Sequence, residues 1–201
     1  MGLQKTAKNL EKNGFAVSLF ETAAEAANYL NSEIDGKTVG FGGSITFEEM
    51  NLYDSLSPHN TVYWHWRTNE QNDADQLRTA AATTDIYLTS VNGLAKTGEL
   101  INIDGTGNRL ASTIFGHKKI YFIVGVNKIE ATYDKALWRA RNIAAPKNAQ
   151  RLKRKTPCAK DADRCHDCSS PERICRALTV IWRKMSSCEM EVVLINEKLG
   201  Y

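Results

Sequence analysis

The spacing of apolar and polar residues predicts helices that alternate with strands along most of the chain. Residues 3–13 place apolar side chains on one face of a helix that Gly14 would end, and residues 15–20 alternate as a short strand. Thr22 followed by Glu25 forms a capping box, which predicts a helix from residue 22. Strands are expected at 37–41, 86–89, 101–103 and 192–195, helices at 46–52 and 73–82, and residues 62–66 form an apolar, aromatic run.

The strongest strand signal lies at residues 119–126, which are nearly all apolar, as in parallel strands buried on both faces. A helix with an apolar face is expected next, with Pro146 at its end. This alternation predicts an α/β protein with an open, mostly parallel sheet flanked by helices. The pattern changes near Lys147, so we expect one domain over residues 1–201. A Cys-rich, basic C-terminal appendage at about 147–184 would be inserted before the last strand.

Composition indicates the cellular compartment of the protein and the chemistry of its cysteines. The 201 residues are 42% hydrophobic, which suits one folded domain. The longest apolar run, residues 120–126, is too short to cross a bilayer, and no leader pattern opens the chain. We therefore expect a cytoplasmic protein with no membrane partner. Disulfides are rare in that compartment, so clustered cysteines indicate metal or redox chemistry.

Four of the five cysteines fall within one short segment. Cys158, Cys165, Cys168 and Cys175 are spaced C-x6-C-x2-C-x6-C. Four thiolates can bind Zn²⁺ tetrahedrally or hold a [4Fe–4S] cluster, and the central C-x2-C suits either. We predict that these four cysteines bind a single centre, a [4Fe–4S] cluster with zinc as the alternative. Cys188 lies outside the motif and is expected to be a small core residue.

Positive charge is concentrated around these cysteines. The whole chain carries +3, whereas residues 147–184 hold eleven basic and four acidic residues. Such a surplus is compatible with a nucleic-acid patch, with support for thiolates, or with a solvated surface. Only Trp182 could stack on bases there. We expect the basic segment to support the cysteines and to dock an acidic partner rather than nucleic acid.

Three stretches that follow expected strands carry groups suited to an anion. In a parallel sheet the carboxyl ends of the strands lie at one edge, where ligands bind. Glycine amides, a hydroxyl, amide side chains and two cations suit a carboxylate or a phosphate. Glu99 and Asp104 are candidate catalytic carboxylates. The expected ligand-binding residues are Gly42, Gly43, Ser44, Asn92, Thr97, Gly98, Gly107, Asn108, Arg109, Asn127 and Lys128.

With these motifs the chain resembles the LUD-domain (lactate-utilization) family. The matching stretches are GGS at 42–44, NGLAKTGELINIDGTGNR at 92–109, GHKK at 116–119, VGVNKI at 124–129, RARNIAAPKNAQRL at 139–152, and the cysteine segment. The resemblance implies a fold like that of sugar-phosphate isomerases and coenzyme A transferases. It also implies a link to the oxidation of lactate to pyruvate and an iron–sulfur partner protein.

Three hypotheses for function follow. In the first, the protein takes part in 2-hydroxyacid oxidation: it binds a small anionic metabolite and exchanges electrons with an iron–sulfur or redox partner through a [4Fe–4S] cluster. In the second, it is a transferase or isomerase that acts on an acyl or phosphorylated substrate, with zinc as a structural element at the cysteines. In the third, it is a nucleic-acid or regulatory module. The sequence is also compatible with a homodimer.

Overall fold

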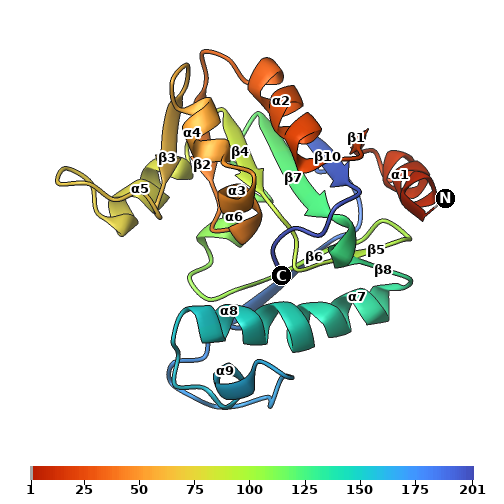
Figure 1. Ribbon diagram of the computed structural model, residues 1–201, viewed down its shortest axis with the longest axis vertical. Coiled ribbons are helices and arrows are strands. Elements are labelled where there is room, and N and C mark those ends of the chain that lie inside the picture. Colours follow the sequence, from red (N-terminus) through yellow and green to blue (C-terminus); the bar gives the residue numbers. More distant parts are fainter. Residues whose placement is uncertain (1) are drawn as a thin grey trace.

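A six-stranded parallel sheet forms the centre of the computed structural model, which describes residues 2–201 (Figure 1). Its strand order is β1-β10-β7-β4-β2-β3, and every neighbouring pair runs parallel. The expected open, mostly parallel α/β fold is therefore confirmed. The strands are β1 (Ala16–Phe20), β2 (Thr38–Phe41), β3 (Thr61–Trp64), β4 (Ile86–Thr89), β7 (Lys119–Gly125) and β10 (Glu189–Ile195).

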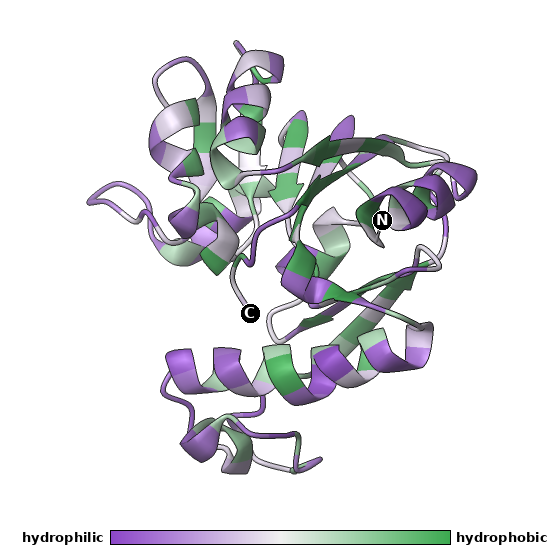
Figure 2. Ribbon diagram, turned by 45° about the vertical axis from the view of Figure 1, so that its right-hand side comes forward, coloured by the Kyte–Doolittle hydropathy of each residue, from purple (hydrophilic) through white to green (hydrophobic). Residues whose placement is uncertain are grey.

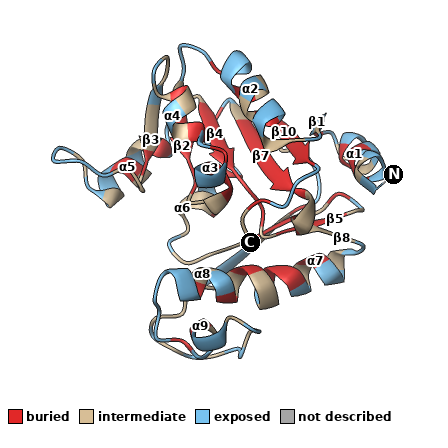
Figure 3. Cartoon of the chain, in the orientation of Figure 1, coloured by how far each residue is buried: buried red, intermediate tan, exposed pale blue. Residues whose placement is uncertain are grey.

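Helices cover both faces of this sheet, and alternate residues of β7 serve two cores. Tyr121 and Ile123 pack with α2 and α4, whereas Ile120, Phe122 and Val124 pack with α1. Successive side chains of a strand point to opposite faces, so the continuous apolar run expected at 119–126 fills both cores. The buried strands appear red in Figure 3. The helices of this part are α1 (Gly2–Lys12), α2 (Ala23–Glu33), α3 (Ile45–Glu49), α4 (Leu52–Leu56), α5 (Ala74–Ala81) and α6 (Asn108–Ser112).

Local signals set several helix ends. The Thr22–Glu25 capping box begins α2 as expected, and Asp73 with Gln76 forms a second one at α5. A helix starts within 46–52 as expected, but the chain divides here into the two short helices α3 and α4. Asn51 breaks them apart with a φ of 51°, in the left-handed region that asparagine tolerates better than most residues.

A second, mixed sheet has the order β8-β5-β6-β9 and was not expected as a separate layer. Its strands are β5 (Gly93–Ala95), β6 (Leu100–Asp104), β8 (Ile129–Glu130) and β9 (Ala177–Ile181). β5 and β6 form a hairpin, and β9 pairs antiparallel with β6. Strands this short carry little periodic signal, and pairing with β9 joins residues more than seventy positions apart in the chain.

One long helical rod crosses below both sheets, made of α7 (Tyr133–Arg139), the π-helical turn η2 (Ala140–Ala144) and α8 (Ala145–Arg151) (Figure 1). The expectation that the helix ends at Pro146 is wrong, because Pro146 lies in the first turn of α8. Proline lacks the N–H that an uninterrupted α-helix would need there, and the wider π-helical turn before it lets the rod continue. In residues 2–201 no helix is long and apolar enough to cross a membrane.

The cysteine segment lies beneath the rod, next to the short helix α9 (Pro157–Asp161) (Figure 1). Its ribbon is mainly exposed or half-buried in Figure 3 and mixed in hydropathy in Figure 2, unlike the apolar strands of the central sheet. Two links attach the segment to the hairpin sheet. The Arg176 N–H donates to the Asp104 carbonyl at 3.0 Å, and a Cβ on Gly105 would lie 2.7 Å from the Ile174 carbonyl oxygen, so only glycine fits there.

Candidate functional site

A cavity of about 570 Å³ opens between the carboxyl edge of the central sheet, helix α8 and residues 171–176. A smaller recess of about 60 Å³ adjoins it and ends at Lys128. The two share wall residues that include Gly43, Asn92 and Arg109. We call them the outer pocket and the inner recess. The sequence-predicted residues that line one or both are Gly43, Ser44, Asn92, Asp104, Asn108, Arg109 and Lys128.

Three predicted residues lie elsewhere, at the far end of the β5–β6 hairpin. Thr97, Gly98 and Glu99 form its turn, which packs against α1. The Asn9 side chain of α1 donates a hydrogen bond to the Lys96 carbonyl at 2.7 Å. The Thr97 hydroxyl donates to the Glu99 carboxylate. Glu99 therefore shares no cavity wall with Asp104, and the geometry gives it no contact with a ligand in the outer pocket.

Three more predicted residues support the site without lining it: Gly42, Gly107 and Asn127. The side chain of Asn127 accepts from Leu199 N–H (3.0 Å) and donates to the Gly200 carbonyl (3.3 Å). Gly107 begins α6 with a φ of 94°. A Cβ on Gly42 would lie 3.2 Å from Cδ of Arg109, so the missing side chain lets that arginine pack against the strand end.

Arg109 organises the wall of the pocket through its own hydrogen bonds. Its guanidinium donates to Asn102 Oδ1 (2.5 Å), to Asn92 Oδ1 (3.2 Å) and to the Ile103 carbonyl (2.6 Å). Its Nε lies 4.0 Å from Asp104, whose carboxylate also accepts from the backbone N–H groups of residues 105, 106 and 109. Asp104 thus fixes the loop that leads into α6, and most of the donors of Arg109 are already used.

We expect Arg109→Ala to cost roughly 2–3 kcal/mol of the free energy of unfolding and to weaken binding of a small anion. Removing the guanidinium takes three charged hydrogen bonds from the wall, although Asn92 Oδ1 and Asn102 Oδ1 each keep a backbone N–H donor. Urea denaturation and calorimetric titration with pyruvate measure the two effects. Arg109→Lys keeps the charge but cannot bridge three acceptors, so it should recover only part of the stability. Wild-type stability in the alanine variant would contradict this role.

Lys128 is a buried amine at the end of the inner recess, with 3% of its surface exposed. Its Nζ donates to Thr46 Oγ1 (2.9 Å) and to Ser90 Oγ (2.8 Å). No carboxylate in residues 2–201 forms an ion pair with it. Burial, reinforced by the positive charges of Arg139 and Arg109, lowers the pKa of Lys128 to about 7. An anionic ligand in the recess would supply the missing counter-charge.

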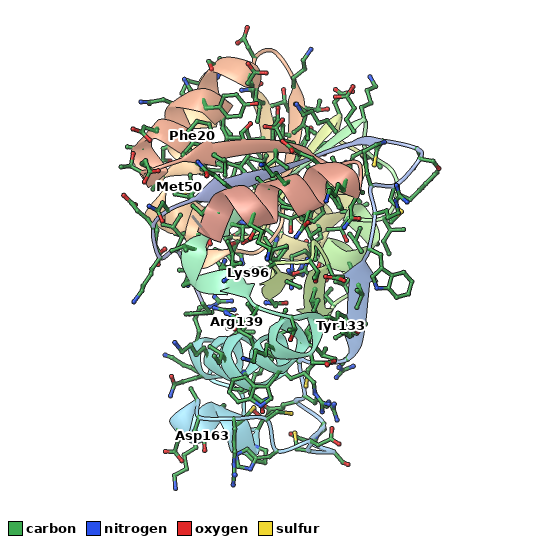
Figure 4. The ribbon with its side chains drawn as sticks, turned by 90° about the vertical axis from the view of Figure 1, so that its right-hand side faces the viewer. Phe20, Met50, Lys96, Tyr133, Arg139 and Asp163 are labelled. Carbon is green, nitrogen blue, oxygen red and sulfur yellow. The ribbon has the colours of Figure 1, made fainter. Side chains whose placement is uncertain are left out.

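Arg139 connects the helical rod to this part of the sheet. It is 3% exposed and lies between the rod and the body of the molecule (Figure 4). Its Nε donates to the Asn127 carbonyl (2.8 Å) and its NH1 to the Asn92 carbonyl (2.5 Å). Burial lowers its pKa. Arg139 therefore holds together two of the loops that sequence analysis placed at the site.

Several wall residues of the outer pocket were missed by sequence analysis. His65 and Trp66 follow β3, and burial with the nearby Arg78 lowers the pKa of His65 to about 4. The signal that could have found them is the carboxyl end of β3, which belongs to the same sheet edge as the other loops. Four arginines of the basic segment also line the pocket: Arg151, Arg154, Arg173 and Arg176. Part of the charge surplus around the cysteines thus faces this cavity.

The four motif cysteines line one small cavity of about 20 Å³ under α8. Figure 4 shows sulfur atoms in the segment around Asp163. Several donors contact the sulfurs: Arg173 Nε on Cys175 (3.2 Å), Asp167 N–H on Cys165 (3.3 Å) and Arg141 on Cys165 (3.9 Å). Cationic and N–H donors of this kind stabilise thiolates.

Cys188 behaves differently from the motif cysteines. It is 8% exposed and packs in the core that the central sheet shares with α1, where burial raises the pKa of its thiol. Its expected role as a small core residue agrees with this placement.

Within residues 2–201, no three His, Cys, Asp or Glu side chains are arranged as a site for a single metal ion.

The structure is that of an α/β protein with two adjoining cavities at the carboxyl edge of a parallel sheet. The family model described as the LUD domain matches residues 3–195, so the chain belongs to the LUD-domain family. Membership links it, at the level of the family, to lactate utilization. Among curated proteins no sequence matches the chain at a significant level.

A solved structure supports the fold assignment. The chain is similar to a DUF162 family protein from Deinococcus radiodurans, with a TM-score of 0.57 and 12% sequence identity over 96% of each chain. At this identity the similarity shows the shared fold.

Proposed function

We propose that this LUD-domain protein binds a small carboxylate in the inner recess and holds a [4Fe–4S] cluster at its four motif cysteines, for electron exchange during 2-hydroxyacid oxidation. The observation that carries the proposal is that the outer pocket shares wall residues with the inner recess on one side and with the cysteine cavity on the other. Ala145, Arg173 and Ile174 line both the outer pocket and the cysteine cavity, so one thin wall separates them.

The recess supplies what a carboxylate requires. Lys128 offers a buried, unpaired amine that carries a positive charge on about half of the molecules near pH 7. Asn92 and Ser44 add an amide and a hydroxyl to the same walls. Arg109 holds Asn92 in place and adds a second positive charge. A carboxylate bound there would favour the charged form of Lys128 and be held by it.

The shared cavity of the four motif cysteines supports a group bound through their sulfurs, although the side chains as placed do not yet surround a single metal ion. All four motif cysteines line it, three N–H donors already point at two of the sulfurs, and Ala145, Pro146, Ala149 and Ile174 supply apolar walls. Cys158, Cys165, Cys168 and Cys175 would be the ligands, and Arg141 and Arg173 would offset their negative charge. A [4Fe–4S] cluster, when bound, carries one electron at a time.

A redox partner completes this proposal. Oxidation of a 2-hydroxyacid to a 2-oxoacid releases two electrons and two protons, so an oxidising partner protein must accept the electrons in succession. The cysteine segment lies at the surface, and its exposed basic residues suit an acidic partner (Figure 3). Because Arg151, Arg154, Arg173 and Arg176 face a pocket, we do not assign this segment to nucleic acid.

A redox titration with and without pyruvate tests this coupling. An anion held in the inner recess, which adjoins the outer pocket but shares no wall residue with the cysteine cavity, should make the midpoint potential of the centre more negative, because an added negative charge stabilises the oxidised form. Chloride at matched ionic strength is the control. An unchanged potential under conditions where calorimetry shows saturation with pyruvate would contradict the coupling.

A further inference from the structure

We infer that the outer pocket is a binding site for a ligand that carries a pyrophosphate group, separate from the small carboxylate assigned to the inner recess. The inference does not depend on a cluster at the cysteines. It rests on the charge of the pocket walls, on which of those charges already have protein partners, and on the size of the cavity.

Positive charge dominates the walls of the outer pocket. Six arginines line it against two acidic residues, Asp104 and Glu172. Both carboxylates are engaged: Asp104 accepts from the N–H groups of its own loop, and Glu172 accepts from Lys155 N–H (2.8 Å). His65 is neutral at pH 7, since its pKa is about 4. The arginines are Arg78, Arg109, Arg151, Arg154, Arg173 and Arg176.

Three of these arginines have no acidic partner. Arg78 pairs with Asp75 at 2.5 Å, Arg173 with Asp167 at 3.4 Å, and Arg109 lies 4.0 Å from Asp104. Across residues 2–201, Arg151, Arg154 and Arg176 form no ion pair. Arg151 donates to the neutral Asn148 (2.9 Å), and Arg176 donates to backbone carbonyls. Three guanidiniums facing one cavity repel each other, and a multiply charged anion between them would remove that repulsion.

Two buried polar atoms of the same wall also lack a partner within the described chain. Nε of Arg78 and Nδ1 of His65 are inaccessible at the atom level and make no hydrogen bond. Both residues line the outer pocket. Buried polar atoms are normally satisfied, so this part of the wall would have to shift before a ligand could contact either atom, and the inference does not rest on them.

The cavity is larger than a three-carbon acid needs. Its volume of about 570 Å³ falls in the range of pockets that hold cofactor-sized ligands, whereas the inner recess has only about 60 Å³. One carboxylate would also leave most of the arginine charge uncompensated. A pyrophosphate group carries several negative charges and many acceptor oxygens, and the planar fork of arginine binds such oxygens bidentately.

Trp66 lies in the pocket wall beside Arg151 and would contact an organic part of this ligand only if the Arg151 guanidinium moved from its ring to the pyrophosphate. Trp66 stacks on Trp64 with ring centroids 5.1 Å apart, and the Arg151 guanidinium lies 4.6 Å from its ring centroid. The pyrophosphate could therefore belong to inorganic pyrophosphate, to a nucleoside diphosphate or to coenzyme A. All three ligands contain a pyrophosphate group, so comparing their affinities shows which of them the pocket prefers.

Calorimetric titration of the full-length chain with inorganic pyrophosphate, ADP and coenzyme A, each at matched ionic strength, tests the inference. We expect at least one to bind ten times or more tightly than lactate and inorganic phosphate. Tighter binding of ADP or coenzyme A than of pyrophosphate would assign the source to the organic ligand. The inference is overturned if none binds more tightly than lactate, or if a random single-stranded oligonucleotide displaces the bound ligand at physiological salt.

Matched variants locate the site. Arg151→Ala and Arg154→Ala change exposed side chains, so both should fold, and each should weaken binding about tenfold or more. Arg183→Ala removes the same charge from an exposed position outside the pocket and should change affinity less than twofold. Equal weakening in all three variants would show a diffuse charge effect and overturn the assignment. Retention of pyrophosphate binding by Cys168→Ser would separate this site from the cluster.

Discussion

Replacing Cys168 by serine should remove nearly all of the iron that we expect in protein purified without oxygen, and should leave the α/β core folded. Cys168 belongs to the central C-x2-C and lines the cysteine cavity with the other three motif residues. Loss of one of four thiolates leaves a cluster without a complete ligand set. Iron and sulfide analysis measures the loss, and far-ultraviolet circular dichroism with urea denaturation measures the fold.

The placement of the segment explains why the core should survive. The motif cysteines are half-buried in a segment beneath α8, whereas the two large cores lie on either face of the central sheet. Cys188→Ser is the matched control: it should keep the full iron content and lose about 1–2 kcal/mol of stability, because it puts a hydroxyl in an apolar core. Equal iron in wild type and Cys168→Ser would contradict the assignment of ligands.

Replacing Lys128 by methionine should abolish carboxylate binding and stabilise the protein. The pKa of Lys128 is about 7 in the folded chain, against an ordinary 10.5 in the unfolded chain. The unfolded chain therefore binds more protons between these two pH values, so the burial penalty is complete below about pH 7 and fades as pH rises toward 10.5. The penalty is roughly 4–5 kcal/mol at neutral pH. Loss of the bonds to Thr46 and Ser90 offsets part of the gain.

Urea denaturation at pH 6, 8 and 10 checks this sign. We expect a gain of about 2–3 kcal/mol for Lys128→Met at pH 6 and little or none at pH 10. Lys135→Met, which changes an exposed lysine of α7, is the control and should show no such trend. In the wild type, affinity for pyruvate should fall as pH rises above about 7, because the amine loses its charge. A destabilised methionine variant at pH 6 that still binds pyruvate would contradict the account.

Most of the central sheet could be predicted from local sequence patterns. These patterns involve residues that are neighbours in the chain, so no long-range contact had to be known. Examples are the capping box at Thr22, the alternation in β1 and the continuous apolar run of β7. The shared edge of parallel strands then brought Ser44, Asn92, Arg109 and Lys128 to adjoining cavities. What the sequence did not indicate was that most donors of Arg109 are used within the wall itself.

Long-range pairings account for what was missed. β9 joins β6 from the far side of the cysteine segment, and that pairing places residues 171–176 against the loop that follows Asp104. No local sequence pattern indicates such a contact, so it could not be predicted that Arg173 and Arg176 line the outer pocket. Thr97 and Glu99 lie close in sequence to Asn92, yet the hairpin directs them to its opposite end.

The most direct test of the proposed function is the metal and sulfide content of the wild-type chain purified without oxygen. The account predicts a brown protein with broad absorption near about 400 nm and about four iron and four sulfide per chain. A colourless protein with one zinc and no sulfide, or one with neither metal, would contradict it.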